Sequence, residues 1–222
     1  MILTPQGKWD DTCIRCSLHQ CRGGYPPLFL QGAAPAKYLI VTEAPSIEDL
    51  QSGYLNSGQK LDIIFELLNE SGIDTNTVCF TALVACPSYK IIPAGEDDEG
   101  ERIAYQSPRA EEIAACEPRL NEVIYRIDPR LIITFGTPPW KNLVSTQDRK
   151  RKNTITECAG DIFDVWIRGR GRDVRYPLLG LLPVEQIISN PSRAAHGPAA
   201  QTLAALTTAR HYVTKLEGEE AT

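Results

Sequence analysis

Four of the seven cysteines are spaced so that they could bind one metal centre. Cys13 and Cys16 form a Cys-x-x-Cys pair, which brings two thiolates within reach of a single site. Cys86 follows an apolar, β-rich run, and Cys116 lies inside the helix that we expect next. Three chain segments can thus converge to supply four thiolates. Zinc and an iron–sulfur cluster both accept four cysteines, so the ligand count does not choose between them.

The other cysteines are better explained as small buried hydrophobic residues: Cys21, Cys79 and Cys158. Cys21 is nevertheless near enough to Cys16 to compete for a ligand role. An odd number of cysteines, behind an N-terminus without a signal-peptide pattern, disfavours a disulfide framework. A redox dithiol would normally follow a strand, whereas Cys13 and Cys16 precede every strand that we predict. A metal or cluster site is therefore the favoured interpretation.

The segments that must position these residues alternate between strand and helix. Apolar, β-rich runs predict buried strands over 37–42, 78–84 and 130–135, and further strands over 162–167 and 176–182. Helical spacing predicts helices over 59–71 and 199–216, and another that Pro108 opens and that contains Cys116. Ile187 and Ile188 are interpreted as the end of one more strand. This alternation predicts a parallel sheet that is covered by helices on both faces.

Ligands of such sheets bind at the loops that follow the carboxyl ends of the strands. The candidate loops are 43–46, 82–87, 136–140 and 190–196. We expect the functional site where these loops meet.

Composition and charge restrict the class of protein. The 42% hydrophobic and 23% charged residues are typical of a globular protein, and no apolar run approaches the roughly 18 residues of a membrane span. The net charge of −5 argues against a surface coated with basic residues, but basic patches at 149–152 and 168–175 suit local contact with nucleic acid. We expect a cytoplasmic monomer with one domain over 1–222, comprising an irregular arm at 1–35, a surface insertion at 91–106 and an acidic tail at 217–222.

The order of the motifs resembles the uracil-DNA glycosylase superfamily, specifically its iron–sulfur branch (family 4). The resemblance runs from about residue 13 to 215, and the helix with Cys116 is its most specific part. The motifs that carry it are Cys13-Ile-Arg-Cys16, Thr42-Glu-Ala-Pro-Ser46, Tyr54-Leu-Asn-Ser-Gly58, Thr81-Ala-Leu-Val-Ala-Cys86, Glu111-Glu-Ile-Ala-Ala-Cys116-Glu-Pro-Arg-Leu120, Pro129-Arg-Leu-Ile-Ile-Thr-Phe-Gly136 and Asn190-Pro-Ser192. The resemblance implies an α/β fold with a small parallel four-stranded sheet between helices, in three α/β/α layers. It also implies a [4Fe–4S] cluster on Cys13, Cys16, Cys86 and Cys116, and DNA as the partner.

The chain departs from the family pattern at residues that would contact the base. Ala82 replaces an asparagine that reads uracil, and alanine has neither the donor nor the acceptor of an amide and leaves empty volume. Asn190 replaces the histidine of the late loop and cannot become cationic beside an anionic leaving base. Glu43 is retained. Either the pocket is enlarged for another base or catalysis is lost, and we favour the first because Glu43, the cysteines and the Pro-Ser loop are kept together.

Excision of a base requires that the nucleotide leaves the stack and that charge on sugar and base is stabilised. The predicted catalytic residues are Glu43, for the water or the sugar cation, and Asn190, for the base. The predicted substrate-binding residues are Tyr54 as a stacking surface, Pro45 and Ala82 beside the base, and Ser192, Arg193 and His196 near phosphate.

These assignments predict a DNA glycosylase that leaves an abasic site. Its expected substrate is a modified pyrimidine, such as hypermodified cytosine in phage DNA, in a role in antiviral defence. The alternatives are a uracil-DNA glycosylase of base-excision repair and a non-catalytic DNA- or lesion-binding protein of the same fold.

Overall fold

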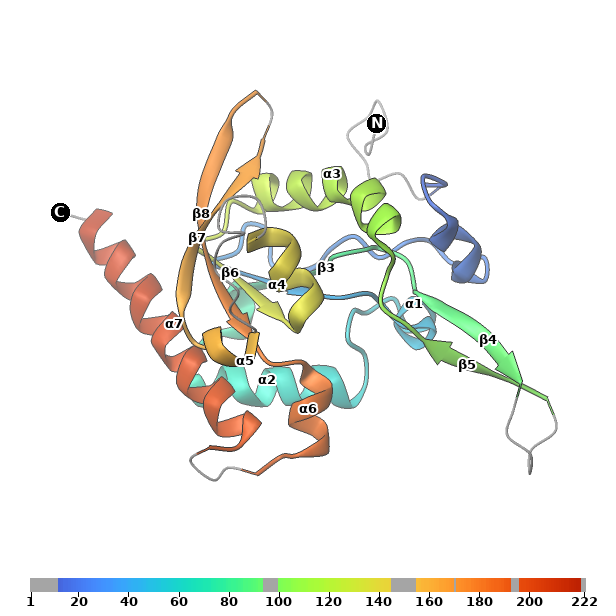
Figure 1. Cartoon of the computed structure of the whole chain (residues 1–222). Coiled ribbons are helices and arrows are strands. Elements are labelled where there is room, and N and C mark those ends of the chain that lie inside the picture. The colour runs from blue at the N-terminus through green and yellow to red at the C-terminus, as the bar shows by residue number, and fades with distance from the viewer. Residues whose placement is uncertain (1–11, 94–99, 145–154, 170, 193–195, 221–222) are drawn as a thin grey trace.

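The computed structural model describes residues 12–93, 100–144, 155–169, 171–192 and 196–220, and a six-stranded sheet forms its centre (Figure 1). The strand order is β1-β3-β2-β6-β8-β7. The inner strands run parallel: β3 (Val78–Ala82), β2 (Tyr38–Thr42), β6 (Leu131–Phe135) and β8 (Asp173–Leu181). The edge strands β1 (Gln31–Gly32) and β7 (Ile162–Arg168) are antiparallel to their neighbours. The four-stranded parallel sheet is thus confirmed, with an antiparallel strand added at each edge.

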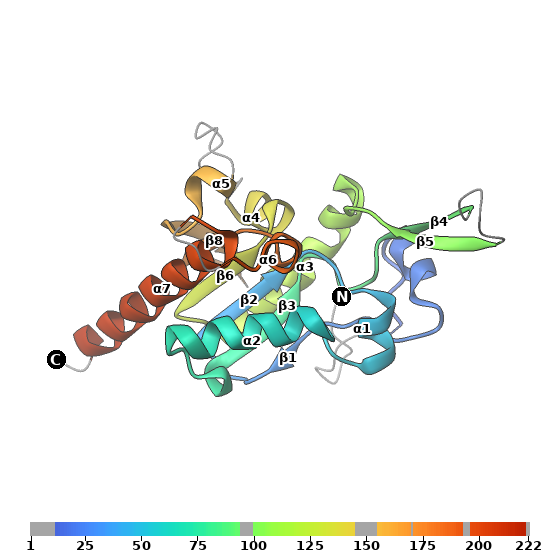
Figure 2. The same ribbon diagram turned by 90° about the horizontal axis from the view of Figure 1, so that it is seen from below.

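Helices cover both faces of the sheet (Figures 1 and 2). One layer contains α2 (Gln59–Ser71), α6 (Val184–Ser189) and α7 (Pro198–Glu220), and the other contains α3 (Ala110–Ile127), α4 (Thr137–Val144) and α5 (Ile155–Cys158). Alternate residues of β2 enter the two cores: Tyr38 and Ile40 pack with the first layer, and Leu39 and Val41 with the second. Burial on both faces explains why β2, β3 and β6 are apolar throughout. The three-layer α/β/α fold is confirmed.

Shorter elements surround the carboxyl ends of the parallel strands. They are the 3-10 helix η1 (Ser17–Arg22), α1 (Ile47–Ser52) and the hairpin of β4 (Tyr89–Pro93) and β5 (Glu101–Tyr105). A second 3-10 helix, η2 (Thr75–Thr77), lies at the other end of the sheet, directly before β3. The hairpin extends away from the sheet in Figure 1, and Tyr105 anchors it by accepting a hydrogen bond from the Ile47 backbone nitrogen at 3.0 Å.

Two predicted boundaries differ in the structure. Ile187 and Ile188 lie in helix α6 and do not end a strand, because Ile187 packs into the core while Glu185 and Gln186 face outward. Two adjacent apolar residues are compatible with either element. Helix α3 begins at Ala110, two residues after Pro108. Within the described residues, no helix is both long and apolar enough to cross a membrane.

Candidate active site and metal centre

The four predicted ligand cysteines line one cavity, which we call the cysteine cavity. Cys13 and Cys16 come from the arm before η1, Cys86 from the segment after β3, and Cys116 from α3. Cys21 does not line it; its thiol lies 3.9 Å from the Tyr89 carbonyl oxygen. Cys79 in β3 and Cys158 in α5 are buried in the core. The structure therefore brings together the three segments on which the cysteine prediction depends.

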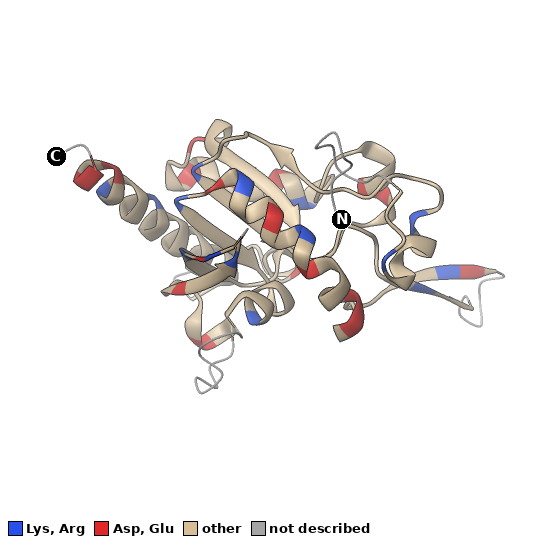
Figure 3. Ribbon diagram, turned by 90° about the horizontal axis from the view of Figure 1, so that it is seen from above, with Lys and Arg blue, Asp and Glu red and all other residues tan. Residues whose placement is uncertain are grey.

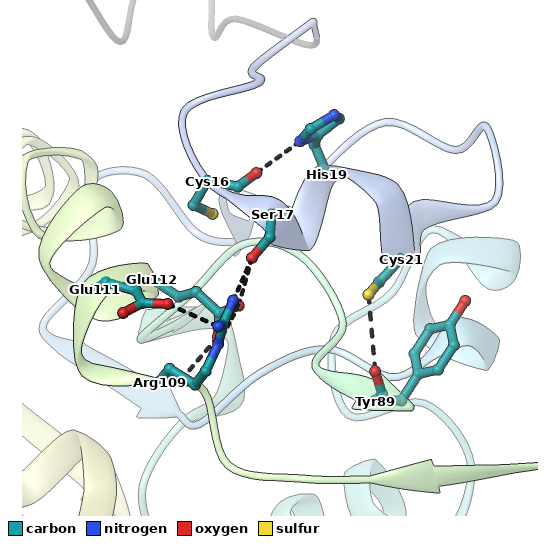
Figure 4. Close-up of polar contacts among 8 residues, drawn as sticks. All are labelled: Cys16, Ser17, His19, Cys21, Tyr89, Arg109, Glu111 and Glu112. Carbon is teal, nitrogen blue, oxygen red and sulfur yellow. Dashed lines mark hydrogen bonds and ion pairs between the residues drawn. The ribbon is translucent and has the colours of Figure 1, made fainter. Parts of the chain in front are cut away.

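Hydrogen bonds hold the arm against the first turn of α3 (Figure 4). The Ser17 hydroxyl donates to Glu112 Oε1 at 2.7 Å, and Arg109 Nη2 donates to both Ser17 Oγ and Glu112 Oε1 at 2.8 Å. Burial alone would raise the pKa of Glu112, but hydrogen bonds from Arg109 and Ser17 outweigh it and hold the pKa below its usual value. This ionised carboxylate fixes the position of Cys16 relative to Cys116.

Arg119 is a buried cation on the wall of the cysteine cavity, with only 2% of its surface exposed. Its guanidinium donates to Thr81 Oγ1 at 2.7 Å, to the Ala82 carbonyl oxygen, and to the Leu83 carbonyl oxygen at 2.9 Å. Its Nε has no hydrogen-bond partner, and among the described residues no carboxylate forms an ion pair with it. Because an uncompensated buried charge is costly, this cavity is suited to an anionic occupant.

The chemistry of the donor set fits a metal centre. Burial raises the pKa of the Cys86 thiol to about 12 and also raises that of Cys16, so the thiolate forms need a nearby positive charge. A metal supplies that charge, and Arg119 would balance the excess negative charge of four thiolates. Among the residues described, no three cysteine, histidine or carboxylate side chains converge on a position for a single ion.

Glu43 follows the carboxyl end of β2 and lines two adjoining cavities of about 300 and 400 Å³. We call the first the Asn56 cavity, the second the Ser88 cavity, and both together the Glu43 cleft. The residues common to both walls are Glu43, Ala44, Lys60, Ser107 and Glu185. The Asn56 cavity also reaches the junction of β6 and α4, at Gly136, Thr137 and Pro138. Volumes of this size are typical of small-molecule binding sites.

Several buried polar atoms of the cleft have no hydrogen-bond partner. They are Thr42 Oγ1, Glu43 Oε1 and Asn56 Nδ2 in the Asn56 cavity, and Ser88 Oγ in the Ser88 cavity. Buried polar groups in folded proteins are nearly always paired, so an unpaired set at one place is available to water or to a polar ligand. The cleft is thus a candidate binding site.

An ion pair crosses the cleft between two helices. Lys60 Nζ of α2 lies 2.6 Å from Glu185 Oε1 of α6, and both residues line both cavities. Burial alone would raise the pKa of Glu185, but the hydrogen bond and charge of Lys60 lower it below the usual value.

The sequence analysis did not identify three residues of the cleft: Lys60, Glu185 and Asn56. Asn56 lies within the 54–58 motif of the sequence, whereas the strand predicted to end at Ile187 and Ile188 gives no reason to place Glu185 at the site.

Two predicted base-contacting residues lie outside the cleft. Tyr54 is 58% exposed and lines neither cavity. Ala82 is fully buried in the core, and its carbonyl oxygen accepts a hydrogen bond from Arg119. The empty volume expected beside Ala82 is therefore not part of the cleft. Pro45, by contrast, lines the Ser88 cavity.

The late-loop residues lie beyond the end of α6. Asn190 is exposed at the C-terminus of that helix and lines neither cavity, and Ser192 and His196 are also exposed. The His196 backbone oxygen accepts a hydrogen bond from Gln201 Nε2 at 2.9 Å. Arg193 lies outside the described residues. The α6 residue that reaches the cleft is Glu185, near the start of the helix.

Of the two basic patches, Arg149–Lys152 falls outside the described residues. The described residues of the other patch line neither cavity of the cleft, and Arg175 pairs with Asp164. Arg168 and Arg172 flank the turn between β7 and β8, which is at the amino end of β8. Because β8 runs parallel to β6 and β6 to β2, this turn is at the opposite end of the sheet from Glu43. Figure 3 shows how basic and acidic residues are distributed over the ribbon.

Comparisons with known proteins agree with this architecture. A family model described as the uracil DNA glycosylase superfamily matches residues 29–211. A type-4 uracil-DNA glycosylase of Pyrobaculum aerophilum is 27% identical over 166 residues, which cover 75% of this chain and 74% of that protein. A type-4 uracil-DNA glycosylase of Sulfurisphaera tokodaii is 27% identical over 156 residues, which cover 70% of this chain and 63% of that protein. The chain therefore belongs to the uracil DNA glycosylase superfamily, where its similarity is to type-4 members.

Proposed function

We propose that the protein is an iron–sulfur DNA glycosylase that flips a base out of DNA and hydrolyses its N-glycosidic bond, leaving an abasic site. The observation that carries the proposal is Glu43, whose buried Oε1 has no partner and which lines both cavities at the carboxyl end of a central strand. A carboxylate in this position can orient a water towards the sugar carbon or stabilise positive charge on the sugar.

Charge on the departing base needs a second group. Lys60 places an ammonium on the wall shared by both cavities, and its ion pair with Glu185 fixes its position. We propose that this cation stabilises negative charge on the base, the role predicted for Asn190, which lines neither cavity. DNA is the proposed partner, bound by a cytoplasmic monomer.

The proposed substrate is a modified pyrimidine, with hypermodified cytosine in phage DNA as the leading example and antiviral defence as the role. The Ser88 cavity supports this specificity because it extends the Asn56 cavity past Glu43. Its wall includes the Ser88 hydroxyl, which has no partner and can bind a polar substituent on the base. Plain uracil would not fill this second space.

Uracil removal in base-excision repair is the second candidate, and the names of the two type-4 relatives favour it. At 27% identity these relatives share the fold while their base-contacting residues can differ.

We further propose that Cys13, Cys16, Cys86 and Cys116 hold a [4Fe–4S] cluster. Four cysteines also suit a zinc ion, and the similarity to type-4 uracil-DNA glycosylases favours the cluster. When bound, the cluster supplies a structural cross-link between the arm, the segment after β3 and α3. Buried Arg119 supports an anionic occupant.

A cleavage screen tests the proposed function. Purified protein is incubated with single-stranded and duplex oligonucleotides that contain uracil, hydroxymethylcytosine, glucosylated hydroxymethylcytosine or unmodified cytosine. Alkali then cuts any abasic product. We expect product with a modified pyrimidine from the wild type and none from Glu43→Gln. Product from uracil alone would establish the repair alternative, and tight DNA binding without any product would overturn the enzymatic proposal.

A further inference from the structure

We infer that Asn56 hydrogen-bonds the polar edge of the flipped pyrimidine. This inference rests on the proposed function. Asn56 is 5% exposed, it lines the Asn56 cavity together with Glu43, and its amide nitrogen has no hydrogen-bond partner. A buried amide donor without an acceptor loses the free energy of its hydrogen bonds to water, so a ligand that supplies the acceptor is favoured.

The backbone of Asn56 is held in an uncommon conformation. Its φ of 59° lies in the left-handed region, which asparagine tolerates better than most residues but which glycine adopts without cost. Side chains fix both neighbours: the Leu55 nitrogen donates to Gln31 Oε1 at 2.5 Å, and the Ser57 nitrogen and hydroxyl both donate to Asp49 Oδ1 at 2.7 Å. Glycine would satisfy the backbone here, so the amide side chain itself requires an explanation.

The same buried carboxylate connects Asn56 to the loop of Glu43. Asp49 is 5% exposed, and its Oδ2 accepts a hydrogen bond from the Ser46 nitrogen at 3.0 Å while its Oδ1 holds Ser57. The loop that begins with Glu43 and the segment that carries Asn56 are thus tied to one side chain. Their relative position is set by the fold before a ligand binds, as recognition of a base requires.

The chemistry of the amide matches a pyrimidine edge. A cytosine-type base presents the N3 acceptor beside the N4 donor, and a uracil-type base presents the O4 acceptor beside the N3 donor. Asn56 Nδ2 can donate to the acceptor in either case, and Oδ1 can accept from the donor. The function that an asparagine at position 82 would perform is thereby supplied from a different segment of the chain.

Two substitutions separate the amide from the backbone. Asn56→Gly retains the left-handed conformation but removes the amide, and Asn56→Asp keeps the shape but replaces the donor with an acceptor. We expect Asn56→Gly to lower the single-turnover excision rate about 10- to 100-fold, which corresponds to one buried hydrogen bond, with an unchanged melting temperature. Asn56→Asp should shift the ratio of rates towards cytosine-type bases about 10-fold, because an aspartate repels O4 and accepts from N4. Asn76→Asp, at an exposed position in η2, is the matched control and should change neither rate nor ratio.

A binding measurement keeps this inference separate from the proposed function. Affinities are compared for duplexes with one mismatched modified pyrimidine and for matched duplexes with an abasic analogue. If the wild type excises no base but binds the pyrimidine duplex more tightly, and Asn56→Gly abolishes that difference, the proposed enzymatic function fails and the reading role stands. Wild-type rates from Asn56→Gly, or equal wild-type affinity for both duplexes, would overturn the inference.

Discussion

The cysteine cavity and the Glu43 cleft lie at the same end of the sheet, after neighbouring parallel strands, yet their polar groups differ in kind. The cysteine cavity is lined by thiols and by the buried cation of Arg119. A hydrogen bond from Ser17 to Glu112 of α3 holds the arm that carries Cys13 and Cys16. The Glu43 cleft has carboxylates, hydroxyls and an amide, several of them without partners.

This difference shows which parts of the site can vary. A metal centre accepts only a few residue types as ligands, so its residues are easily identified in a sequence. A base is recognised by donors and acceptors that many residue types and several segments can supply. Consequently, Ala82 and Asn190 can depart from the family pattern while Asn56 and Lys60 furnish polar groups from elsewhere.

The largest expected effect comes from breaking the cysteine cavity. Cys86→Ser should release most of the iron and destabilise the arm, because a structural metal site contributes its binding free energy to folding. Iron content, absorbance near 400 nm and the melting temperature would measure the loss. Cys21→Ser is the matched control, since Cys21 lies outside the cavity, and it should retain iron. Full iron content in Cys86→Ser would contradict the assignment of the ligands.

The second effect is confined to the cleft. Glu43→Gln should lower excision about 100- to 10,000-fold, the range for loss of a general base, while iron content stays at the wild-type level. Single-turnover excision rates and iron content, measured on the same preparations of wild type and Glu43→Gln, test this prediction. A parallel loss of iron would show that the two regions are not independent.

Arg119 offers a test of the link between the regions, because it lines one cavity and binds carbonyl oxygens at the end of β3. Arg119→Met should leave these acceptors unpaired at a cost of about 1–3 kcal/mol in unfolding free energy. It should also lower the reduction potential of the cluster, since a nearby positive charge favours the reduced form. Arg119→Lys keeps the positive charge but not the full set of hydrogen bonds. It should therefore bring the reduction potential closer to the wild-type value than the unfolding free energy. A potential unchanged in Arg119→Met would rule out charge compensation.

The smallest expected effect on stability is that of the Lys60–Glu185 pair, because both side chains are substantially exposed. The pKa of Glu185 is lowered in the folded protein, so the pair stabilises above the unfolded pKa and that contribution is lost as pH falls through the folded pKa. The difference in melting temperature between wild type and Lys60→Met should therefore be small at pH 7 and disappear below about pH 4. Excision by Lys60→Met should fall about 10- to 100-fold if this cation stabilises the base. A wild-type rate would assign the pair to helix packing alone.

Much of the architecture could be predicted from local patterns. The uninterrupted apolar runs of β2, β3 and β6 indicated strands buried on both faces, and this conclusion depends only on the residues within each run. The segment at Ile187 could not be assigned in the same way, because only tertiary packing decided that α6 is a helix.

By itself, the sequence determined the alternation of strands and helices and the four cysteines that could meet, since both are expressed in residue types at fixed spacings. It also drew attention to Glu43, because ligands of parallel sheets bind at the loops that follow the carboxyl ends of the strands. Only the tertiary structure decided which polar groups share a cavity with Glu43. Asn56, Lys60 and Glu185 come from three separate segments, and no pattern within any one of them records that they face the same space. Ala82, which the sequence placed beside the base, is instead packed in the core.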